Sequence, residues 1–428
     1  MNKELKISFD ILKNVIVDKS YVSIELNKVL NKIKDSDINS SLITKIVYGV
    51  LEKDILLDYF IARFLKKSPK IEILIVLKIV AYVSKEINSI PSFALVNEMV
   101  NITKKIDMHQ SGFVNAVSKK LISSNIVLPN KSDKIKYLSV KYNYPEWVIR
   151  ELLKSKDLDF VEKLVSKDLT TLTHIRVNLL EISANDFKKK LDDLQINYEN
   201  SLYDYTLYVD YAKLLKTNLD RYYVVQGLPS IITCNCLDAK SGNVLDVCAA
   251  PGGKSMYLAQ NKNLNIIACD VHKHRVDLIE KFAKSLKLDN IKCYMQDGTN
   301  LKNDWIEYFD YVLCDVPCSN LGVSRKKPDV FLNKTKKDVE VLSKLQYSIL
   351  DNASKYVKKG GILQYSTCTI IDEENKNIID KFMQNHKDFE LTEINVDGLE
   401  LFNNGHTYTF YPHLTNTEGF FIGRLRRK

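Results

Sequence analysis

Two cysteines in this chain follow short apolar runs whose composition predicts buried strands. Cys318 ends the segment DVPC at 315–318, and Cys368 ends the segment YSTC at 365–368, 50 residues further along the chain. Cysteine is well suited to nucleophilic attack near neutral pH, because a small fraction is already thiolate and sulfur is intrinsically nucleophilic. If the two strands are neighbours, both thiols can reach one substrate. The pattern therefore indicates covalent catalysis.

A glycine-rich turn follows an apolar run upstream of both cysteines. Its candidate cofactor-binding residues are Cys248, Ala249, Ala250, Pro251, Gly252, Gly253 and Lys254. A phosphate-binding P-loop would need glycine at position 248, and Pro251 removes an amide donor, so that motif does not fit. Gly252 and Gly253 let a ligand approach the backbone, and a helix beginning near Lys254 would offer free amide groups to a carboxylate. The turn predicts a nucleotide-type cofactor site.

Two aspartates follow the next two predicted strands. Asp270 comes directly after the apolar run 266–269, and Asp297 lies just past the run 291–294. An acidic residue at the first position can accept hydrogen bonds from both ribose hydroxyls of a nucleotide, and Asp297 is placed to reach the adenine edge. A single aspartate at a strand end is more often a helix cap or a turn former. Two of them after this turn favour cofactor binding.

From about residue 236 onward, predicted strands and helices alternate. The strand patterns are 244–247, 266–269, 291–294, 311–314 and 362–365. Helices are expected between them, including 273–286 and 341–357, the second closed by Gly360-Gly361. Such alternation predicts a parallel sheet with helices on both faces, and ligands bind such sheets at the carboxyl ends of the strands.

The first half of the chain has a different pattern. Residues 1–135 show apolar spacing typical of helices, whereas 136–235 mix helix and strand signals, with strands expected at 175–178 and 207–209. Arg176 lies in the first of these strands. Two interpretations of it stay open, contact with RNA and a salt bridge at a strand end.

Composition sets broad limits. The 428 residues include 62 Lys and Arg against 53 Asp and Glu, a net charge of +9 that leans toward a polyanionic partner. All eight cysteines lie at or after Cys234, without a C-x-x-C pair, which argues against a disulfide scaffold and a zinc site. The apolar run 73–83 is too short to span a bilayer, and no signal peptide is evident. We expect a cytoplasmic monomer without metal or membrane association.

The cysteine segments and the glycine turn together resemble the RNA cytosine-5 methyltransferases of the RsmB/NOP family, which use S-adenosylmethionine. The resemblance implies that the turn, Asp270, Asp297 and Asp315 bind this cofactor. The segments ALVNEMV at 94–100 and SGFVNAV at 111–117 are similar to the NusB helical domain, an RNA- and protein-binding module.

The fold class implied is α/β, a Rossmann-like class I methyltransferase domain preceded by an all-α NusB-like domain and a small α+β subdomain. The expected domains are an RNA-binding helical domain at 1–135, a linker and small subdomain at 136–235, and the catalytic domain at 236–428. A helical bundle without a ligand is the alternative for the first domain, because periodicity alone does not exclude it.

The resemblance also assigns roles to the catalytic residues. Cys368 is implied to be the nucleophile that adds to cytosine C6, and Cys318 to assist product release. Asp315 is implied to hydrogen-bond the N3 edge of cytosine as a protonated acid, which burial can produce. A helix opening around Asp372 would favour a thiolate at Cys368, but Asp372 and the two glutamates that follow it oppose that effect.

Departures from the family pattern are small. Val316 stands where alanine is usual, and Gln226-Gly227 replaces a common Gln-Asp pair, so we leave that loop out of the site. The basic run 325–327 follows the catalytic strand. It has two open interpretations, a solvated charge run and contact with RNA phosphates.

The resemblance implies an enzyme that makes 5-methylcytosine in 16S ribosomal RNA, the small-subunit rRNA. One alternative is a transfer-RNA methyltransferase with the same chemistry. Another, of a different class, is an RNA-binding regulatory protein whose methyltransferase fold is inactive, and the intact cysteine pair and glycine turn count against it.

Overall fold

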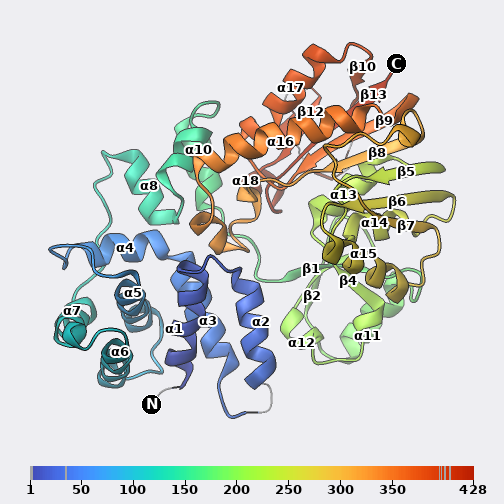
Figure 1. Ribbon diagram of the computed structural model, residues 1–428. Helices are drawn as coiled ribbons and strands as arrows, with labels where there is room; N and C mark the ends of the chain where they lie inside the picture. The colour runs from blue at the N-terminus through green and yellow to red at the C-terminus, as the bar shows by residue number, and fades with distance from the viewer. Residues whose placement is uncertain (1–2, 34–35, 395, 397, 400–401, 404–405) are drawn as a thin grey trace. The chain divides into compact units, whose positions relative to one another are not determined.

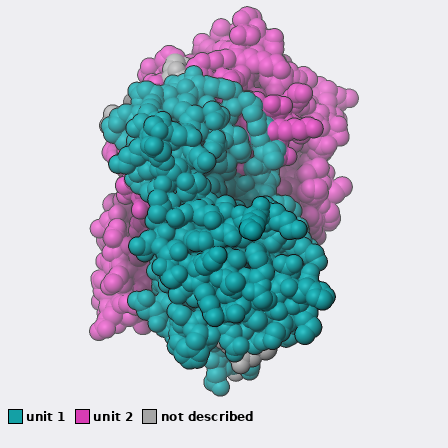
Figure 2. All heavy atoms as spheres, turned by 90° about the vertical axis from the view of Figure 1, so that its left-hand side faces the viewer, with its two compact units in different colours: residues 1–166, 324–336 teal, residues 167–323, 337–428 magenta. Residues whose placement is uncertain are grey.

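The computed structural model describes residues 3–33, 36–394, 396, 398–399, 402–403 and 406–428 (Figure 1). The chain forms two compact units, coloured separately in Figure 2. Unit 1 consists of 1–166 and 324–336, and unit 2 of 167–323 and 337–428. The domain boundaries expected from sequence, at 135/136 and 235/236, stay predictions.

Unit 1 is helical. Its helices are α1 (Lys3–Ile16), α2 (Val22–Ile33), α3 (Ser40–Glu52), α4 (Asp54–Ala62), α5 (Ile71–Glu86), α6 (Ser92–Ile106), α7 (Ser111–Ser123), α8 (Lys134–Tyr142), α9 (Glu146–Leu152) and α10 (Leu158–Ser166), with a 3₁₀ turn, η1 (Met108–Gln110), before α7. Helix α5 is the centre of its core, since every residue from Ile75 to Val83 is buried. The apolar run 73–83 therefore lies in a helix buried in the core, as expected for a run too short to span a bilayer.

A segment from the second half of the chain belongs to unit 1. Residues 324–336, which contain the 3₁₀ helix η5 (Pro328–Leu332), pack among its helices. Asp329 accepts a hydrogen bond from the first backbone amide of α2, and the Phe331 ring lies 4.9 Å from the Tyr144 ring. Arg325 lies over the same tyrosine ring and donates to the Val165 carbonyl oxygen. Arg325 thus has protein partners. The next two residues of the basic run, Lys326 and Lys327, are exposed.

Unit 2 begins with a small antiparallel sheet in the order β2-β3-β1-β4. Its strands are β1 (Thr173–Val177), β2 (Tyr198–Asn200), β3 (Thr206–Val209) and β4 (Tyr223–Val225), accompanied by α11 (Ala184–Asp193), α12 (Tyr211–Leu214) and the 3₁₀ turn η2 (Asp220–Tyr222). The strands expected at 175–178 and 207–209 correspond to β1 and β3. This α+β arrangement is the one predicted for the middle of the chain.

The large sheet of unit 2 has the order β11-β12-β13-β9-β8-β5-β6-β7, with β10 paired to β13. Its strands are β5 (Gly242–Asp246), β6 (Leu264–Asp270), β7 (Ile291–Met295), β8 (Phe309–Asp315), β9 (Val357–Thr367), β10 (Phe389–Leu391), β11 (Phe402–Asn403), β12 (Thr407–Phe410) and β13 (Phe420–Arg427). The chain runs outward in one direction from β5 to β7 and in the other from β8 to β9. The carboxyl ends of β5 and β8 therefore meet where the strand order reverses, the usual ligand position in such sheets.

Helices cover both faces of this sheet (Figure 1). They are α13 (Leu228–Leu237), α14 (Gly253–Leu258), α15 (Lys273–Ser285), α16 (Lys336–Ser354), α17 (Lys376–Asn385) and α18 (Pro412–Thr415), with short 3₁₀ turns η3 (Asn303–Trp305), η4 (Leu321–Val323) and η6 (Asp372–Glu374). On β5, Val244 packs into the core with α13, α14 and α15, whereas Leu245 packs into the core with α16 and α17. This alternation follows from the two-residue period of a strand.

Two sequence-based expectations need correction. The helix expected at 341–357 ends at Ser354, and Gly360-Gly361 lie inside β9 rather than at a helix end. The pairing of β8 with β9 is irregular there, because Phe309 pairs with Val357 but Tyr311 with Ile362. The two glycines lie at this irregular pairing. In the sequence, the same pair of glycines looks like the end of a helix.

The sheet is also not wholly parallel. Strands β5 to β9 are parallel, but β13 pairs antiparallel with β9, and β10 and β12 pair antiparallel with β13. Within the described residues, no helix combines the length and the hydropathy that crossing a lipid bilayer requires.

Candidate active site

The glycine turn joins β5 to α14 at the carboxyl edge of the large sheet. Gly252 has a φ of 109°, a left-handed conformation that glycine adopts without strain. The turn is held from two sides, since the Ala249 amide donates to the Cys269 carbonyl oxygen at 2.7 Å and Arg275 donates to the Ala250 carbonyl oxygen at 3.1 Å. The turn is therefore fixed by its neighbours and leads into the N-terminus of α14, as the sequence predicts.

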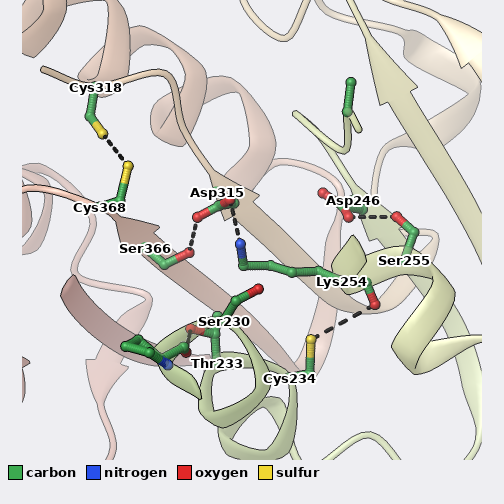
Figure 3. Close-up of polar contacts among 12 residues, drawn as sticks. Ser230, Thr233, Cys234, Asp246, Lys254, Ser255, Asp315, Cys318, Ser366 and Cys368 are labelled. Atoms are coloured by element: carbon green, nitrogen blue, oxygen red, sulfur yellow. Dashed lines mark hydrogen bonds and ion pairs between the residues drawn. The ribbon is translucent and has the colours of Figure 1, made fainter. Parts of the chain in front are cut away.

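Asp246, the last residue of β5, is a polar group that the sequence analysis missed. It is buried, and one oxygen accepts a hydrogen bond from Ser255 Oγ at 2.6 Å, whereas the other has no partner (Figure 3). Burial raises the pKa of Asp246 to about 7, although the Ser255 hydrogen bond and the Lys254 charge act in the opposite direction. A carboxylate at a strand end directly before a glycine turn is the signal that could have found it.

The two predicted cofactor aspartates lie at the ends of the strands expected. Asp270 ends β6, is buried, accepts a hydrogen bond from the His272 amide and lies 3.4 Å from an Arg275 guanidinium nitrogen. Asp297 follows β7, and one of its oxygens accepts from both the amide and the hydroxyl of Thr299. In this structure Asp297 therefore stabilises a turn with one oxygen, which leaves the other for a ligand.

The two cysteines meet. Cys318 follows β8 and Cys368 follows β9, which are paired in parallel, and the two Sγ atoms lie 3.3 Å apart (Figure 3). Cys368 also donates to Asn320 Oδ1 at 2.8 Å. The neighbouring Cys368 thiol, then burial and the Glu374 carboxylate, raise the pKa of Cys318. The structure thus places together two thiols that the sequence separates by 50 residues.

A lysine–aspartate pair lies at the same edge of the sheet. Lys254 Nζ is 2.6 Å from Asp315 Oδ2, and Ser366 Oγ donates to the other oxygen at 2.8 Å (Figure 3). Burial lowers the pKa of Lys254, but the Asp315 carboxylate more than offsets this, and the pKa is raised. The hydrogen bond from Asp315 to the N3 edge of cytosine stays a prediction. The sequence analysis did not take into account this lysine, which comes from the glycine turn.

The loop after Cys318 lies against backbone on two sides. The Gly322 amide donates to the Cys368 carbonyl oxygen at 3.0 Å, and the Gly419 amide donates to the Gly322 carbonyl oxygen at 2.8 Å. A Cβ atom on Gly322 would lie 2.1 Å from the Gly419 oxygen. The two cysteine loops and the start of β13 therefore fit together only because this position has no side chain.

Replacing Gly322 with alanine is expected to separate these loops. We expect a loss of stability of about 3 kcal/mol, at the upper end for overpacking because the clash is with backbone, together with loss of activity. The matched control is Gly112→Ala on α7, where a Cβ would meet nothing within 4 Å and helix propensity favours alanine by about 1 kcal/mol. Thermal unfolding of both variants measures the difference. An equally stable Gly322→Ala protein would contradict this packing.

The helix expected to open around Asp372 begins later. Residues Asp372–Glu374 form the 3₁₀ turn η6, and α17 begins at Lys376. Cys368 therefore does not lie at the N-terminus of an α-helix. One of the three acidic residues of this turn, Glu374, is fully buried.

Arg176 and the loop at Gln226 lie beside the cofactor turn. Arg176 is fully buried, which does not fit contact with RNA, and no carboxylate among the described residues pairs with it. Its Nε donates to Gln226 Oε1 at 3.0 Å, and its guanidinium lies 4.9 Å from the Tyr257 ring centre on α14. The Gln226 amide nitrogen is 3.7 Å from the Cβ position of Gly253. This loop, which the sequence analysis excludes, contacts the turn.

The donors and acceptors at this edge fit a cofactor with an amino-acid end and a nucleoside. The buried Asp246 oxygen without a partner suits a charged amino group, the α14 amide groups suit a carboxylate, and Asp270 suits ribose hydroxyls. Among the described residues, His, Cys, Asp and Glu side chains form no group of three or more that could hold a metal ion.

The fold and this site define a Rossmann-like methyltransferase preceded by a helical domain. Two family models match the chain: the 16S rRNA methyltransferase RsmB/F model over residues 235–426 and the NusB family model over residues 2–122. The probable ribosomal RNA small subunit methyltransferase B of Bacillus subtilis (strain 168) is 32% identical over 447 aligned residues, 99% of this chain and 98% of that protein. The chain belongs to the RsmB/F methyltransferase family.

Other relatives share the catalytic half or the fold. The tRNA (cytosine(72)-C(5))-methyltransferase of Pyrococcus horikoshii is 37% identical over 48% of this chain and 52% of its own length. The crystal structure of PH0851 superposes with a TM-score of 0.85 at 23% identity, covering 100% of this chain and 99% of that one. The structure of NSun6 from Pyrococcus horikoshii superposes with a TM-score of 0.60 at 23% identity, covering 66% of this chain and 98% of that one. Both structures support the fold.

Proposed function

We propose that this protein methylates C5 of a cytosine in 16S ribosomal RNA, with S-adenosylmethionine as the methyl donor. The observation that carries the proposal is the pair of thiols 3.3 Å apart at the ends of β8 and β9. The Lys254–Asp315 ion pair lies at the same edge of the sheet. Cytosine C5 is a weak nucleophile, so its methylation needs a group that first adds to the ring, and a thiol can do this.

In the proposed reaction the Cys368 thiol loses its proton to solvent, and the resulting thiolate forms a bond from sulfur to C6 of cytosine. The electron pair of the C5–C6 bond then makes C5 nucleophilic, while the Lys254 ammonium group, held by Asp315, is placed to stabilise negative charge that develops on the ring. When bound, the cofactor supplies an electrophilic methyl group. After transfer, C5 gives its proton to a water molecule, the electron pair of that C–H bond re-forms the C5–C6 double bond, and the C6–sulfur bond breaks with its electron pair returning to the sulfur. Cys318 assists this elimination.

The glycine turn, Asp270 and Asp297 would hold the cofactor. The Gly252 turn and the N-terminus of α14 would receive its amino-acid end, and Asp270 its ribose. Asp297 has one oxygen outside its turn hydrogen bonds and would receive the adenine edge. These assignments follow from the strand ends at which the residues lie.

The choice of RNA rests on the relatives. A relative called ribosomal RNA small subunit methyltransferase B aligns with 99% of this chain, including the NusB-like part. A tRNA methyltransferase is more identical, at 37%, but only over about half the chain. Full-length alignment favours rRNA, and tRNA is the second candidate. The net charge of +9 suits either RNA.

A strain that lacks this gene is expected to lose one 5-methylcytosine from small-subunit rRNA, because no other enzyme would methylate that site. Bisulfite sequencing of total RNA from the deletion and parent strains measures it, with re-expression of the gene as the control. Loss of a tRNA site, with rRNA unchanged, would support the second candidate. If no 5-methylcytosine disappears from any RNA, the methyltransferase assignment is wrong and the inactive regulatory protein becomes the better explanation.

A further inference from the structure

A buried carboxylate connects the loops that carry the two cysteines. Glu374, in η6, is fully buried. One of its oxygens accepts hydrogen bonds from the Ser319 amide at 2.8 Å and from Gln346 Nε2 at 2.9 Å. The other accepts from the Ser319 hydroxyl. Ser319 and Gln346 therefore give the carboxylate three hydrogen bonds, two of them from Ser319, the residue directly after Cys318.

The same cluster includes the residue directly after Cys368. Thr369 Oγ1 lies 2.9 Å from Ser319 Oγ, and its hydroxyl also interacts with Glu374. Gln346, the third donor to the carboxylate, also donates to the Pro317 carbonyl oxygen at 3.0 Å. Glu374 is thus tied to residues on both sides of Cys318 and to the residue that follows Cys368.

Asn375, the residue after Glu374, contacts the Cys368 loop on both sides of the cysteine. Asn375 Oδ1 accepts from Thr367 Oγ1 at 2.5 Å, and Asn375 Nδ2 donates to the Thr369 carbonyl oxygen at 3.0 Å. Thr367 and Thr369 flank Cys368. Two adjacent residues of one turn therefore contact the chain around both thiols, although neither contacts a sulfur atom directly among the hydrogen bonds of the structure.

A buried carboxylate is costly unless its hydrogen bonds compensate for the loss of water. Among the described residues no Lys or Arg forms an ion pair with Glu374, so hydrogen bonds from neutral groups compensate its charge. Burial raises the pKa of Glu374, and the hydrogen bonds from Ser319, Gln346 and Thr369 oppose that shift. Hydrogen bonds to a charged acceptor are stronger than those between neutral groups. A carboxylate at this position therefore fixes its donors more firmly than an amide would.

We propose that Glu374 is a positioning residue of the methyl-transfer reaction. It holds the Ser319 and Thr369 loops so that the Cys318 and Cys368 thiols both face C5 and C6 of the cytosine. This inference rests on the proposed function. The carboxylate has a second consequence, because its negative charge adds to the effects that raise the pKa of Cys318. It thereby keeps Cys318 protonated, so that Cys318 does not compete with Cys368 for attack on C6.

The test compares Glu374→Gln with the matched control Glu373→Gln. Both variants remove one acidic group from neighbouring positions of η6, but Glu373 is partly exposed and has no hydrogen bond to either cysteine loop. Glutamine offers one acceptor oxygen and turns an amide group toward hydroxyls that now donate to the carboxylate. Each full-length protein is measured with its RNA substrate and cofactor, and rates are normalised to the number of cofactor-binding sites.

For Glu374→Gln we expect kcat to fall about 100-fold, the scale of a misplacement of roughly 1 Å at reacting groups, with KM for RNA and cofactor within about twofold of wild type. Glu373→Gln should match wild type. A loss of folded protein alone would lower the site count and leave the normalised kcat unchanged. A normalised kcat equal to that of Glu373→Gln would therefore overturn the proposal.

A second measurement follows the thiols themselves. Limited alkylation with iodoacetamide, read by peptide mass spectrometry, gives the labelling ratio of Cys318 to Cys368. Removing the charge of Glu374 is expected to raise this ratio about threefold, and removing that of Glu373 should not change it. An unchanged labelling ratio in Glu374→Gln would overturn the inference that the charge of Glu374 helps to raise the pKa of Cys318.

If Glu374→Gln does not fold, Ser319→Ala is the second variant. It removes the hydroxyl group that donates to Glu374 and interacts with the Thr369 hydroxyl, and it keeps the carboxylate. It should lower the normalised kcat in the same way with KM unchanged, and a wild-type kcat would contradict the proposal. These outcomes are distinct from failure of the proposed function, in which wild type itself transfers no methyl group to RNA.

Discussion

Replacing Cys368 with alanine is expected to abolish methyl transfer and to leave no covalent link between protein and RNA. Without this thiol nothing adds to C6 of cytosine, so C5 does not become nucleophilic enough to accept the methyl group. The loss should be complete within the sensitivity of a radiolabelled methyl-transfer assay. Cofactor binding should persist, because the glycine turn and Asp270 lie at the ends of other strands, β5 and β6.

Replacing Cys318 with alanine is expected to give the opposite product. Attack by Cys368 and methyl transfer stay possible, but elimination stalls, so that protein accumulates bound to its RNA. A denaturing gel run after incubation with RNA and cofactor should show a slow-migrating, nuclease-sensitive band for Cys318→Ala and none for Cys368→Ala. The control is Cys293→Ala, a half-buried thiol on β7 at the far side of the parallel strands, which should behave as wild type.

The two cysteine variants separate several explanations. The reverse gel pattern would exchange the roles of the two thiols. No adduct from either variant, with activity retained in both, would mean that these cysteines are core residues and that the methylated atom lies elsewhere. An inactive wild-type protein that still binds RNA would favour the regulatory alternative.

The second large effect is expected for the ion pair beside the thiols. Asp315→Ala leaves the Lys254 ammonium group without its partner in a site where only 12% of the lysine side chain is exposed. We expect the free energy of unfolding to fall by about 3–5 kcal/mol, because the charge of Lys254 is then buried without compensation. We also expect kcat/KM to fall about 100-fold, because Lys254 loses the carboxylate that holds it in place. The exposed pair Lys262–Asp289 is the control. Solvent screens such a pair, so Asp289→Ala should have little effect on stability or activity.

A double substitution distinguishes chemistry from stability. Lys254→Met combined with Asp315→Leu removes both charges, and apolar replacement of a buried pair is often neutral for stability. We expect thermal stability near that of wild type and no methyl transfer. If the double variant were active, the pair would be structural only, and the proposed stabilisation of the cytosine ring would be wrong.

Much of the fold follows from patterns in the chain. The five parallel strands, the all-helical first part and two strands of the small sheet, β1 and β3, are local consequences of hydrophobic periodicity and of turn residues, and the structure has them where expected. The other two strands of the small sheet, β2 and β4, were not predicted. The errors occur where a local signal has two physical meanings. Gly360-Gly361 can end a helix or serve an irregular strand pairing, and only the neighbouring strand β8 decides between them. The antiparallel strands after β9 depend on long-range pairing, which has no local signature.

The sequence by itself determined the kinds of chemical group at the site, because strand-end cysteines, aspartates and a glycine turn are identified by residue type and spacing. Tertiary structure alone decided which groups act on one another. Parallel pairing of β8 with β9 places two thiols in contact, and the adjacency of β5 and β8 brings Lys254 to Asp315. In the sequence Glu374 is one of three consecutive acidic residues, and only the fold shows that it is buried against the cysteine loops. Protonation and hydrogen bonding depend on distances across the sheet, and those distances are set when the strands pair.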